Sequence, residues 1–283
     1  MRAILSPVVC PLVRPLDPVG SDITARDVRQ QHPPMLIEAA SILAVGGAGA
    51  LLAGTRPNSS VFGPVVRDGL RGPFLYLTLD DGPNPEWTER ILETLHSRSV
   101  PATFFMIGQL VRRFPAVARA VVEAAQEIGN HTHDHPNLVR QAPSDVRRQI
   151  DDAHRAIVDE TGHTPKMFRP PYGRQTPLVR LALRRWGYVV VGWRVSARDF
   201  ERPGADVIRR RIRDQLRPGA ILLLHDGDPR NLSGDRGQTA SALPGIIQDA
   251  QAAGYAFRPL SELLERSVGV PPQPPSGNAN SGP

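Results

Sequence analysis

Short apolar runs alternate with amphipathic stretches through the middle of the chain, from residue 74 to residue 266. Four of the runs have the length and composition of β-strands: FLYLTL (74–79), ATFFMI (102–107), YVVVGW (188–193) and AILLLH (220–225). The last two are almost continuously apolar, which is typical of parallel strands covered on both faces. The pattern therefore predicts a buried parallel sheet.

Helical stretches separate these strands. They are predicted at residues 86–95, at AVARAVVEAAQEIG (116–129) and at 144–160, where Ser144 is expected as the N-cap. Strand–helix alternation repeated about six or seven times predicts an α/β fold, a distorted (β/α) barrel of about seven parallel strands that is TIM-barrel-like. An open doubly wound sheet is the alternative, although no G-x-G-x-x-G motif follows the first strand.

The two ends of the chain differ from its middle. Residues 1–34 are rich in proline and charge and show no periodicity, so we expect a flexible N-terminal segment. Residues 267–283 form a tail rich in Pro, Gly and Ser that cannot bury a core, and we expect it to be disordered. The folded domain is therefore expected at residues 61–266.

Residues 35–54 form an apolar run that is long enough for a membrane span or the core of a signal peptide. Arg26 and Arg29 precede it, which suits a cytoplasmic N-terminus, whereas Glu38 weakens the case. We expect a signal or an anchor, and with it export to the cell envelope and possible membrane association. The alternative is a small-residue helix packed on the domain of a cytoplasmic protein.

Composition restricts the partners. The formal net charge is +6 over 283 residues, but Lys166 is the only lysine and the arginines are scattered among carboxylates. Aromatic residues make up 5% of the chain, too few for the stacking surfaces of single-strand binders, so we expect no nucleic-acid partner. Cys10 is the only cysteine, which excludes an internal disulfide and thiolate metal sites. Nothing in the sequence indicates an oligomeric state.

Polar residues gather where the predicted strands end. In a parallel barrel the carboxyl ends of the strands meet at one face, where the chemistry takes place. A single polar residue there is usually a cap or a turn residue, but several clusters rich in Asp, His and Arg favour a catalytic site. The clusters are Asp80-Asp81-Gly82-Pro83, His131 to His135, Arg169-Pro170-Pro171-Tyr172-Gly173, Asp199-Phe200 and His225-Asp226-Gly227.

The paired carboxylates and the histidines favour a divalent metal. Asp80 and Asp81 would repel each other in a dry site unless a cation bound one of them and left the other free to act as a base. One carboxylate and two imidazoles would leave a coordination position open for water, as in catalytic zinc sites, although ferrous iron accepts similar ligands. In NHTHDH (130–135), a helix would put His131 and His135 on one face, whereas a strand would align all three histidines.

The clusters resemble the motifs of a known family. TLDDGP (78–83), HTHDH (131–135) and RPPYG (169–173) are similar to the first three motifs of the polysaccharide deacetylases, the carbohydrate esterase family 4 or NodB-homology domain. ARDF (197–200) and ILLLH (221–225) resemble the fourth and fifth. The motifs occur in the family's order over residues 61–266, which identifies the segment as a polysaccharide deacetylase catalytic domain.

The resemblance implies a role for each residue. It implies that Asp81, His131 and His135 bind a divalent metal, usually zinc, with cobalt or another ion also possible. Asp80 would be the general base, positioned by Arg169, and His225 the general acid, oriented by Asp199. The backbone N–H of Tyr172 would stabilise the oxyanion, and Leu223 would line the pocket for the acetyl methyl group. His133 would be a bystander.

The implied function is the removal of N-acetyl groups from acetylated amino-sugar polymers, such as peptidoglycan or chitin-like oligosaccharides. Three positions depart from the family pattern. Leu79 replaces the usual phenylalanine, which is a packing change, Ser196 stands where an additional aspartate is common, and Phe200 replaces a tryptophan that normally lines the groove. Three alternatives use similar residues: an O-acetyl esterase acting on acetylated xylan, a non-catalytic carbohydrate-binding cell-wall protein, and a ferrous oxygenase.

Overall fold

The computed structural model describes residues 49, 52–231 and 234–267, all of which belong to the unit Ala48–Pro283. The expectations for residues 1–34, for most of residues 35–54 and for the tail beyond residue 267 lie outside these residues. Within the described part of the chain, no helix is long and apolar enough to cross a membrane.

A parallel sheet curled into a distorted (β/α) barrel forms the centre of the domain, which confirms the predicted fold class. Its strands follow the order β5-β4-β3-β2-β1-β7-β6, and β8 pairs with the beginning of β1. The strands are β1 (Phe74–Asp80), β2 (Ala102–Met106), β3 (Glu127–Asn130), β4 (Met167–Phe168), β5 (Val189–Val190), β6 (Val195–Ser196), β7 (Ile221–His225) and β8 (Ala256–Phe257).

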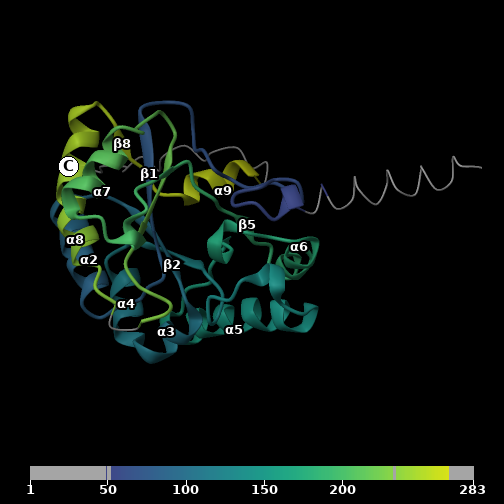
Figure 1. Cartoon of the computed structure of the whole chain (residues 1–283). Helices are drawn as coiled ribbons and strands as arrows, with labels where there is room; N and C mark the ends of the chain where they lie inside the picture. The colour runs from purple at the N-terminus through teal and green to yellow at the C-terminus, as the bar shows by residue number, and fades with distance from the viewer. Residues whose placement is uncertain (1–48, 50–51, 232–233, 268–283) are drawn as a thin grey trace, which may run out of the picture. The chain divides into compact units, whose positions relative to one another are not determined.

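Helices connect most of the successive strands, with β5 and β6 joined by a short non-helical segment, and in Figure 1 α2, α4 and α8 lie outside β1 and β2. The α-helices are α2 (Trp87–Ser97), α3 (Gly108–Arg113), α4 (Pro115–Glu123), α5 (Pro143–Thr161), α6 (Pro177–Arg184), α7 (Ala205–Arg213), α8 (Gly237–Ala252) and α9 (Ser261–Ser267). Short 3₁₀ turns are η2 (Leu138–Arg140), η3 (Pro171–Gly173) and η4 (Asp199–Glu201).

Three details of the predicted elements are wrong. The helix expected at 116–129 ends at Glu123, and Glu127–Asn130 forms β3 between β2 and β4. Only two residues of YVVVGW form β5, because the chain leaves the sheet where Val191 pairs with the segment at Val66. Helix α5 begins at Pro143, and its N-cap is Ala142, two positions before the expected N-cap Ser144, since proline is favoured in the first helical turn.

Alternate side chains of β1 face either the outer apolar layer or the barrel interior, where the site lies. Leu75, Leu77 and Leu79 point outward into the apolar layer beneath the helices. The residues between them, Tyr76, Thr78 and Asp80, therefore face the barrel interior, since successive side chains of a strand point to opposite faces. Strand β7 behaves in the same way, with Leu222 and Leu224 in the outer layer. The same rule carries Leu223 and His225 inward.

Candidate active site

The register of β1 and β7 brings a carboxylate and an imidazole together. Asp80 pairs with His225, and Thr78 pairs with Leu223, one step deeper in the barrel. Because both pairs face inward at the carboxyl ends of their strands, their side chains enter the same space. Asp80, Leu223 and His225 line a cavity of about 360 Å³.

A buried arginine holds Asp80. The side chain of Arg169 follows β4 and has no exposed surface. Its Nη1 donates to Asp80 Oδ1 at 2.6 Å and to Thr78 Oγ1 at 2.8 Å, and Nη2 donates to the carbonyl of Gly192 at 2.9 Å. Asp80 is therefore fixed through Oδ1, while Oδ2 lies 3.7 Å from His131 Nε2.

Asp81, His131 and His135 converge beside Asp80. Their potential ligand atoms all lie within 4.8 Å of one another. Asp81 Oδ1 is 3.4 Å from His131 Nε2 and 3.3 Å from His135 Nε2. The Nδ1 atom of His131 lies 2.6 Å from the carbonyl of Arg169, which leaves Nε2 as the ring nitrogen available to a metal.

This cluster fits a divalent cation. Asp81 Oδ1 is buried and makes no hydrogen bond to any residue that the structure describes. Burial opposes ionisation of Asp81, but the imidazoles of His135, His131 and His225 hold the pKa of its carboxyl well below its usual range. Burial also lowers the pKa of His135 to about 4, despite the opposing charge of Asp81, so that its ring is neutral at pH 7. An ionised carboxylate whose Oδ1 atom has no hydrogen-bond partner among the described residues, beside a neutral imidazole, is a donor set that suits a divalent metal.

The segment 131–135 is neither a helix nor a strand. It turns through left-handed conformations at Thr132 (φ 72°) and His135 (φ 56°). The turn directs His131 and His135 toward Asp81, whereas His133 lies outside the ligand cluster and its Nε2 is 3.7 Å from Asp134 Oδ1. The arrangement with all three histidines on one side of a strand is therefore not the one adopted.

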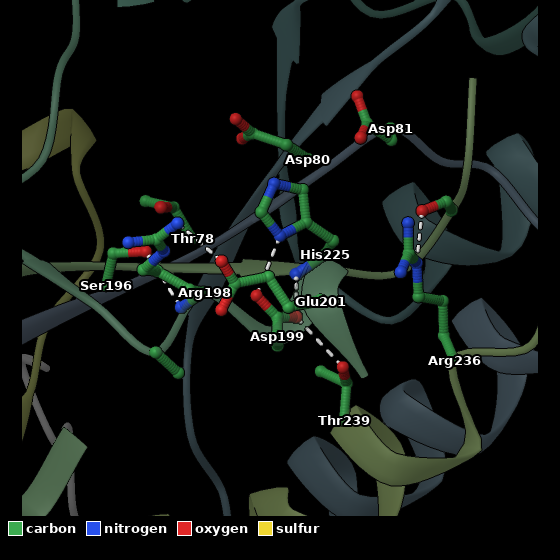
Figure 2. A network of polar contacts seen from close by, with 12 residues as sticks. Thr78, Asp80, Asp81, Ser196, Arg198, Asp199, Glu201, His225, Arg236 and Thr239 are labelled. Atoms are coloured by element: carbon green, nitrogen blue, oxygen red, sulfur yellow. Dashed lines mark hydrogen bonds and ion pairs between the residues drawn. The ribbon is translucent and has the colours of Figure 1, made fainter. Parts of the chain in front are cut away.

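His225 is supported from behind by Asp199. Asp199 Oδ1 lies 2.8 Å from His225 Nδ1, and Oδ2 accepts hydrogen bonds from the backbone N–H of His225 and from Thr239 Oγ1 (Figure 2). Burial alone would lower the pKa of His225, but the charge and hydrogen bond of Asp199 raise it to about 9. The imidazole is therefore protonated at neutral pH, with Nε2 left for a group in the cavity.

Aromatic residues flank this cavity. Tyr172 is in the left-handed conformation at φ 59°, and its ring centroid lies 5.0 Å from that of His135, while the ring centroids of Phe200 and His225 are 5.6 Å apart. Both rings are about half exposed, so each has a face open to a substrate. Trp193 also lines the cavity. Ser196 lies on β6, where its Oγ accepts the backbone N–H of Arg198 at 3.2 Å.

The structure thus brings every predicted site residue to one place, most of them in the cavity wall and Arg169 and Asp199 directly behind it. Several further contributors were not predicted. Trp193 ends a predicted strand and could have been suspected from its position, whereas Thr239 and Arg236 lie in or next to a helix whose sequence gives no sign of a site. Asp226 was noted only as part of the His225 cluster.

Asp226 lies beneath the Asp80-Asp81 turn. It is fully buried, accepts a hydrogen bond from Thr88 Oγ1 at 2.5 Å, and packs against Gly82 so closely that a side chain there would overlap its carboxyl group. Burial, supported by the charges of Asp81 and Asp80, raises the pKa of Asp226 to about 7. The absence of a side chain at Gly82 is thus what allows this turn to pack.

The class of the protein follows from the fold and the site. A buried carboxylate facing two imidazoles at the carboxyl ends of barrel strands, beside an Asp–Arg pair and a His–Asp pair, defines a metal-dependent hydrolase. The sequence pattern of the family described as polysaccharide deacetylase matches residues 68–191.

Comparisons with whole proteins agree. The chain is 36% identical to a chitooligosaccharide deacetylase of Azorhizobium caulinodans over 208 residues, which is 71% of this chain and 99% of the relative. The peptidoglycan deacetylase PdaC of Bacillus subtilis superposes with a TM-score of 0.62 at 30% identity, covering 70% of this chain and 94% of that one. The chain belongs to the polysaccharide deacetylase family.

One structural neighbour shows why the site must be considered separately from the fold. A family 4 pseudoenzyme from Bacillus anthracis superposes with a TM-score of 0.65 at 30% identity, covering 71% of this chain and 69% of that one. The fold by itself therefore carries no chemistry. In this chain Asp80, Arg169, Asp199 and His225 are all in place around the ligand cluster.

Proposed function

We propose that this enzyme removes N-acetyl groups from an acetylated amino-sugar polymer, either peptidoglycan or a chitin-like oligosaccharide. The relatives that act on chitooligosaccharide and on peptidoglycan support this substrate class. The observation that carries the proposal is the pairing of Asp80 with His225 across β1 and β7, which points a base and an acid into the cavity that holds the ligand cluster.

Asp81, His131 and His135 would hold the metal, which we propose to be zinc. When bound there, a divalent metal supplies Lewis-acid polarisation and makes a water molecule acidic enough to attack near neutral pH. Asp80 accepts the proton of the attacking water. Arg169 holds the Oδ1 atom of Asp80, so that Oδ2 is the oxygen free to take this proton.

His225 has the opposite task to Asp80, because it must donate a proton. Amide hydrolysis needs a proton on the departing nitrogen, because a free amide anion is a very poor leaving group. His225 is protonated because Asp199 raises its pKa to about 9, and its Nε2 donates the proton. The backbone N–H of Tyr172 would donate to the oxyanion, and Leu223, which lines the cavity, would contact the acetyl methyl group.

Acetate release tests the proposal. The zinc-loaded protein is incubated with N-acetylated oligomers and, in parallel, with O-acetylated xylan. We expect acetate from the N-acetylated oligomers, and we expect D80N to lower kcat at least about a hundredfold because its amide cannot accept the proton. The variant D145N provides the control, since Asp145 pairs with Arg148 on an exposed part of α5.

Two outcomes would contradict the proposal. Full activity of D80N would remove Asp80 from the role of base, and acetate released only from xylan would assign the enzyme to O-acetyl esters. Metal content is measured for each variant, so that a loss of metal is not mistaken for a loss of the base.

We also propose that the catalytic domain works at the cell envelope and that residues 35–54 are its signal or anchor. The apolar composition of that run supports the proposal. Fractionation of cells expressing the full chain tests it, because a protein found only in the cytoplasmic fraction would contradict it.

A further inference from the structure

Arg236, which directly precedes α8, lies in the wall of the catalytic cavity. Its side chain is 3% exposed, and it lines the same space as Asp80 and His225. Its Nε donates to the carbonyl of Gly227 at 2.6 Å, and its Nη2 lies 3.5 Å from Asp228 Oδ2. In Figure 2 it is drawn to the right of His225.

The guanidinium of Arg236 has fewer partners than its burial requires. Its Nη1 is buried and makes no hydrogen bond to any residue that the structure describes. Arg169, which is equally buried beside the same cavity, uses all of its nitrogen atoms on Asp80, Thr78 and backbone carbonyls. A buried cation with an unused donor is costly, so the comparison indicates that an acceptor is missing beside Arg236.

The charges on this side of the cavity also indicate that Arg236 lacks a full acidic counter-charge. Asp228 is the nearest carboxylate to Arg236, but Arg202 also approaches it, at 3.7 Å. One carboxylate is thus shared between two guanidinium groups, neither at a good hydrogen-bond distance. Arg230 lines the cavity as well and is exposed. This side of the cavity therefore has an excess of positive charge.

Neither of the other carboxylates in the cavity compensates for this excess. Asp80 is paired with Arg169, and Asp81 faces the imidazoles of the ligand cluster. Guanidinium groups bind carboxylates through strong, charge-assisted and often bidentate hydrogen bonds. A carboxylate bound in the cavity would supply a counter-charge beside Arg236, whose Nη2 lies 3.5 Å from Asp228 Oδ2 and whose Nη1 has no partner among the described residues.

We propose that Arg236, with Arg230 beside it, selects substrates that carry a carboxylate next to the reacting N-acetyl group. This inference rests on the proposed function and names its substrate class. Glycan strands of peptidoglycan that have lost their stem peptides carry such a group, the free lactyl carboxylate of their muramic acid sugars, whereas chitooligosaccharides have no carboxylate. The enzyme therefore prefers the carboxylated polymer.

The test compares kcat/KM for two N-acetylated oligomers of equal length, a neutral chitooligosaccharide and an oligomer of alternating N-acetylglucosamine and N-acetylmuramic acid. We expect the metal-loaded enzyme to favour the carboxylated oligomer, and R236Q to reduce the ratio of the two values about tenfold. R230Q, at an exposed position, reduces the ratio by a smaller factor. R155Q removes an arginine from the exposed surface of α5 and leaves the ratio unchanged.

Binding of a carboxylated oligomer from which the acetyl groups have been removed is measured in parallel by calorimetry, because it requires no turnover. We expect it to bind more tightly than the corresponding neutral oligomer, and we expect R236Q to abolish the difference and R230Q to reduce it. R236K, which keeps the charge but loses the planar fork, restores part of it.

Equal preference for the two oligomers, or an unchanged preference in folded R236Q and R230Q, overturns the inference. The proposed function fails separately, when neither N-acetylated oligomer yields acetate. The calorimetric comparison still decides the role of Arg236 in that case.

Discussion

The substitution D199N isolates what makes His225 an acid. In the wild-type protein the carboxylate of Asp199 raises the pKa of His225 to about 9 against the opposing effect of burial. Asparagine keeps the size of the side chain and can still hydrogen bond to Thr239, but it removes the negative charge. Without that charge, burial lowers the pKa of His225 against only the charges of Asp81 and Asp80, so we expect the pKa to return toward its ordinary value of 6.5.

The expected effect follows from the protonated fraction of His225. With a pKa of about 9, roughly 0.9 of the molecules carry the proton at pH 8, whereas with a pKa of 6.5 about 0.03 do so. The rate at pH 8 should therefore fall about thirtyfold or more, which corresponds to a difference of about 2.5 pKa units or 3.4 kcal/mol in the stability of the protonated form. The loss should shrink as the pH is lowered, because the variant regains its proton.

The assay is a pH–kcat profile of acetate release for the wild type and D199N, both metal-loaded. We expect the basic limb of the profile to move from near pH 9 to below pH 7. The control T239V removes one hydrogen bond to Asp199 but keeps the charge, and should move the limb much less. A D199N protein that is folded and metal-loaded yet keeps the wild-type basic limb would refute the assignment of His225 as the acid.

Three further predictions concern the metal ligands, a buried hydroxyl group and the turn that carries the base. H133A should keep the metal affinity of the wild type, whereas H135A should lower that affinity at least about tenfold, as measured by metal titration. Equal losses of affinity in the two variants would place His133 among the ligands. Y188F should lower the free energy of unfolding by about 1–3 kcal/mol in urea, because the buried Tyr188 hydroxyl bonds to Asn130 and His154; a change below about 0.5 kcal/mol would contradict it. G82A should lower kcat at least about tenfold by displacing the turn that carries the base, and a wild-type rate would show that the turn adapts.

The sequence was sufficient for the architecture because the strands of the barrel interior carry strong local signals. The apolar runs at β1, β2 and β7 predict these strands to within a residue or two at each end. The predicted helix at 116–129 wrongly includes most of β3, because a four-residue strand that is held by its neighbours β2 and β4 has no periodicity of its own. Pairing with distant strands decides such elements, and local sequence does not.

The candidate site was predictable for a different reason. Its residues lie at the carboxyl ends of strands or in the loops that follow them, so their approximate positions follow once the strands are found. The orientation of His131 and His135 depends on left-handed residues within the turn, which residue spacing alone could not choose over a helix. Arg236 lies in the loop before α8 and Thr239 lies in α8. Both reach the site only through the tertiary fold, so the sequence alone could not identify them.

Removal and return of the metal tests the central claim most directly. The protein is stripped with a chelator, assayed for acetate release from an N-acetylated amino-sugar oligomer, and assayed again after one equivalent of Zn²⁺ or Co²⁺ is added. We expect the stripped protein to be inactive and the added metal to restore activity in the wild type but not in D80N. Acetate release that survives complete removal of the metal, or a fully metal-loaded wild type that releases none, would contradict the account.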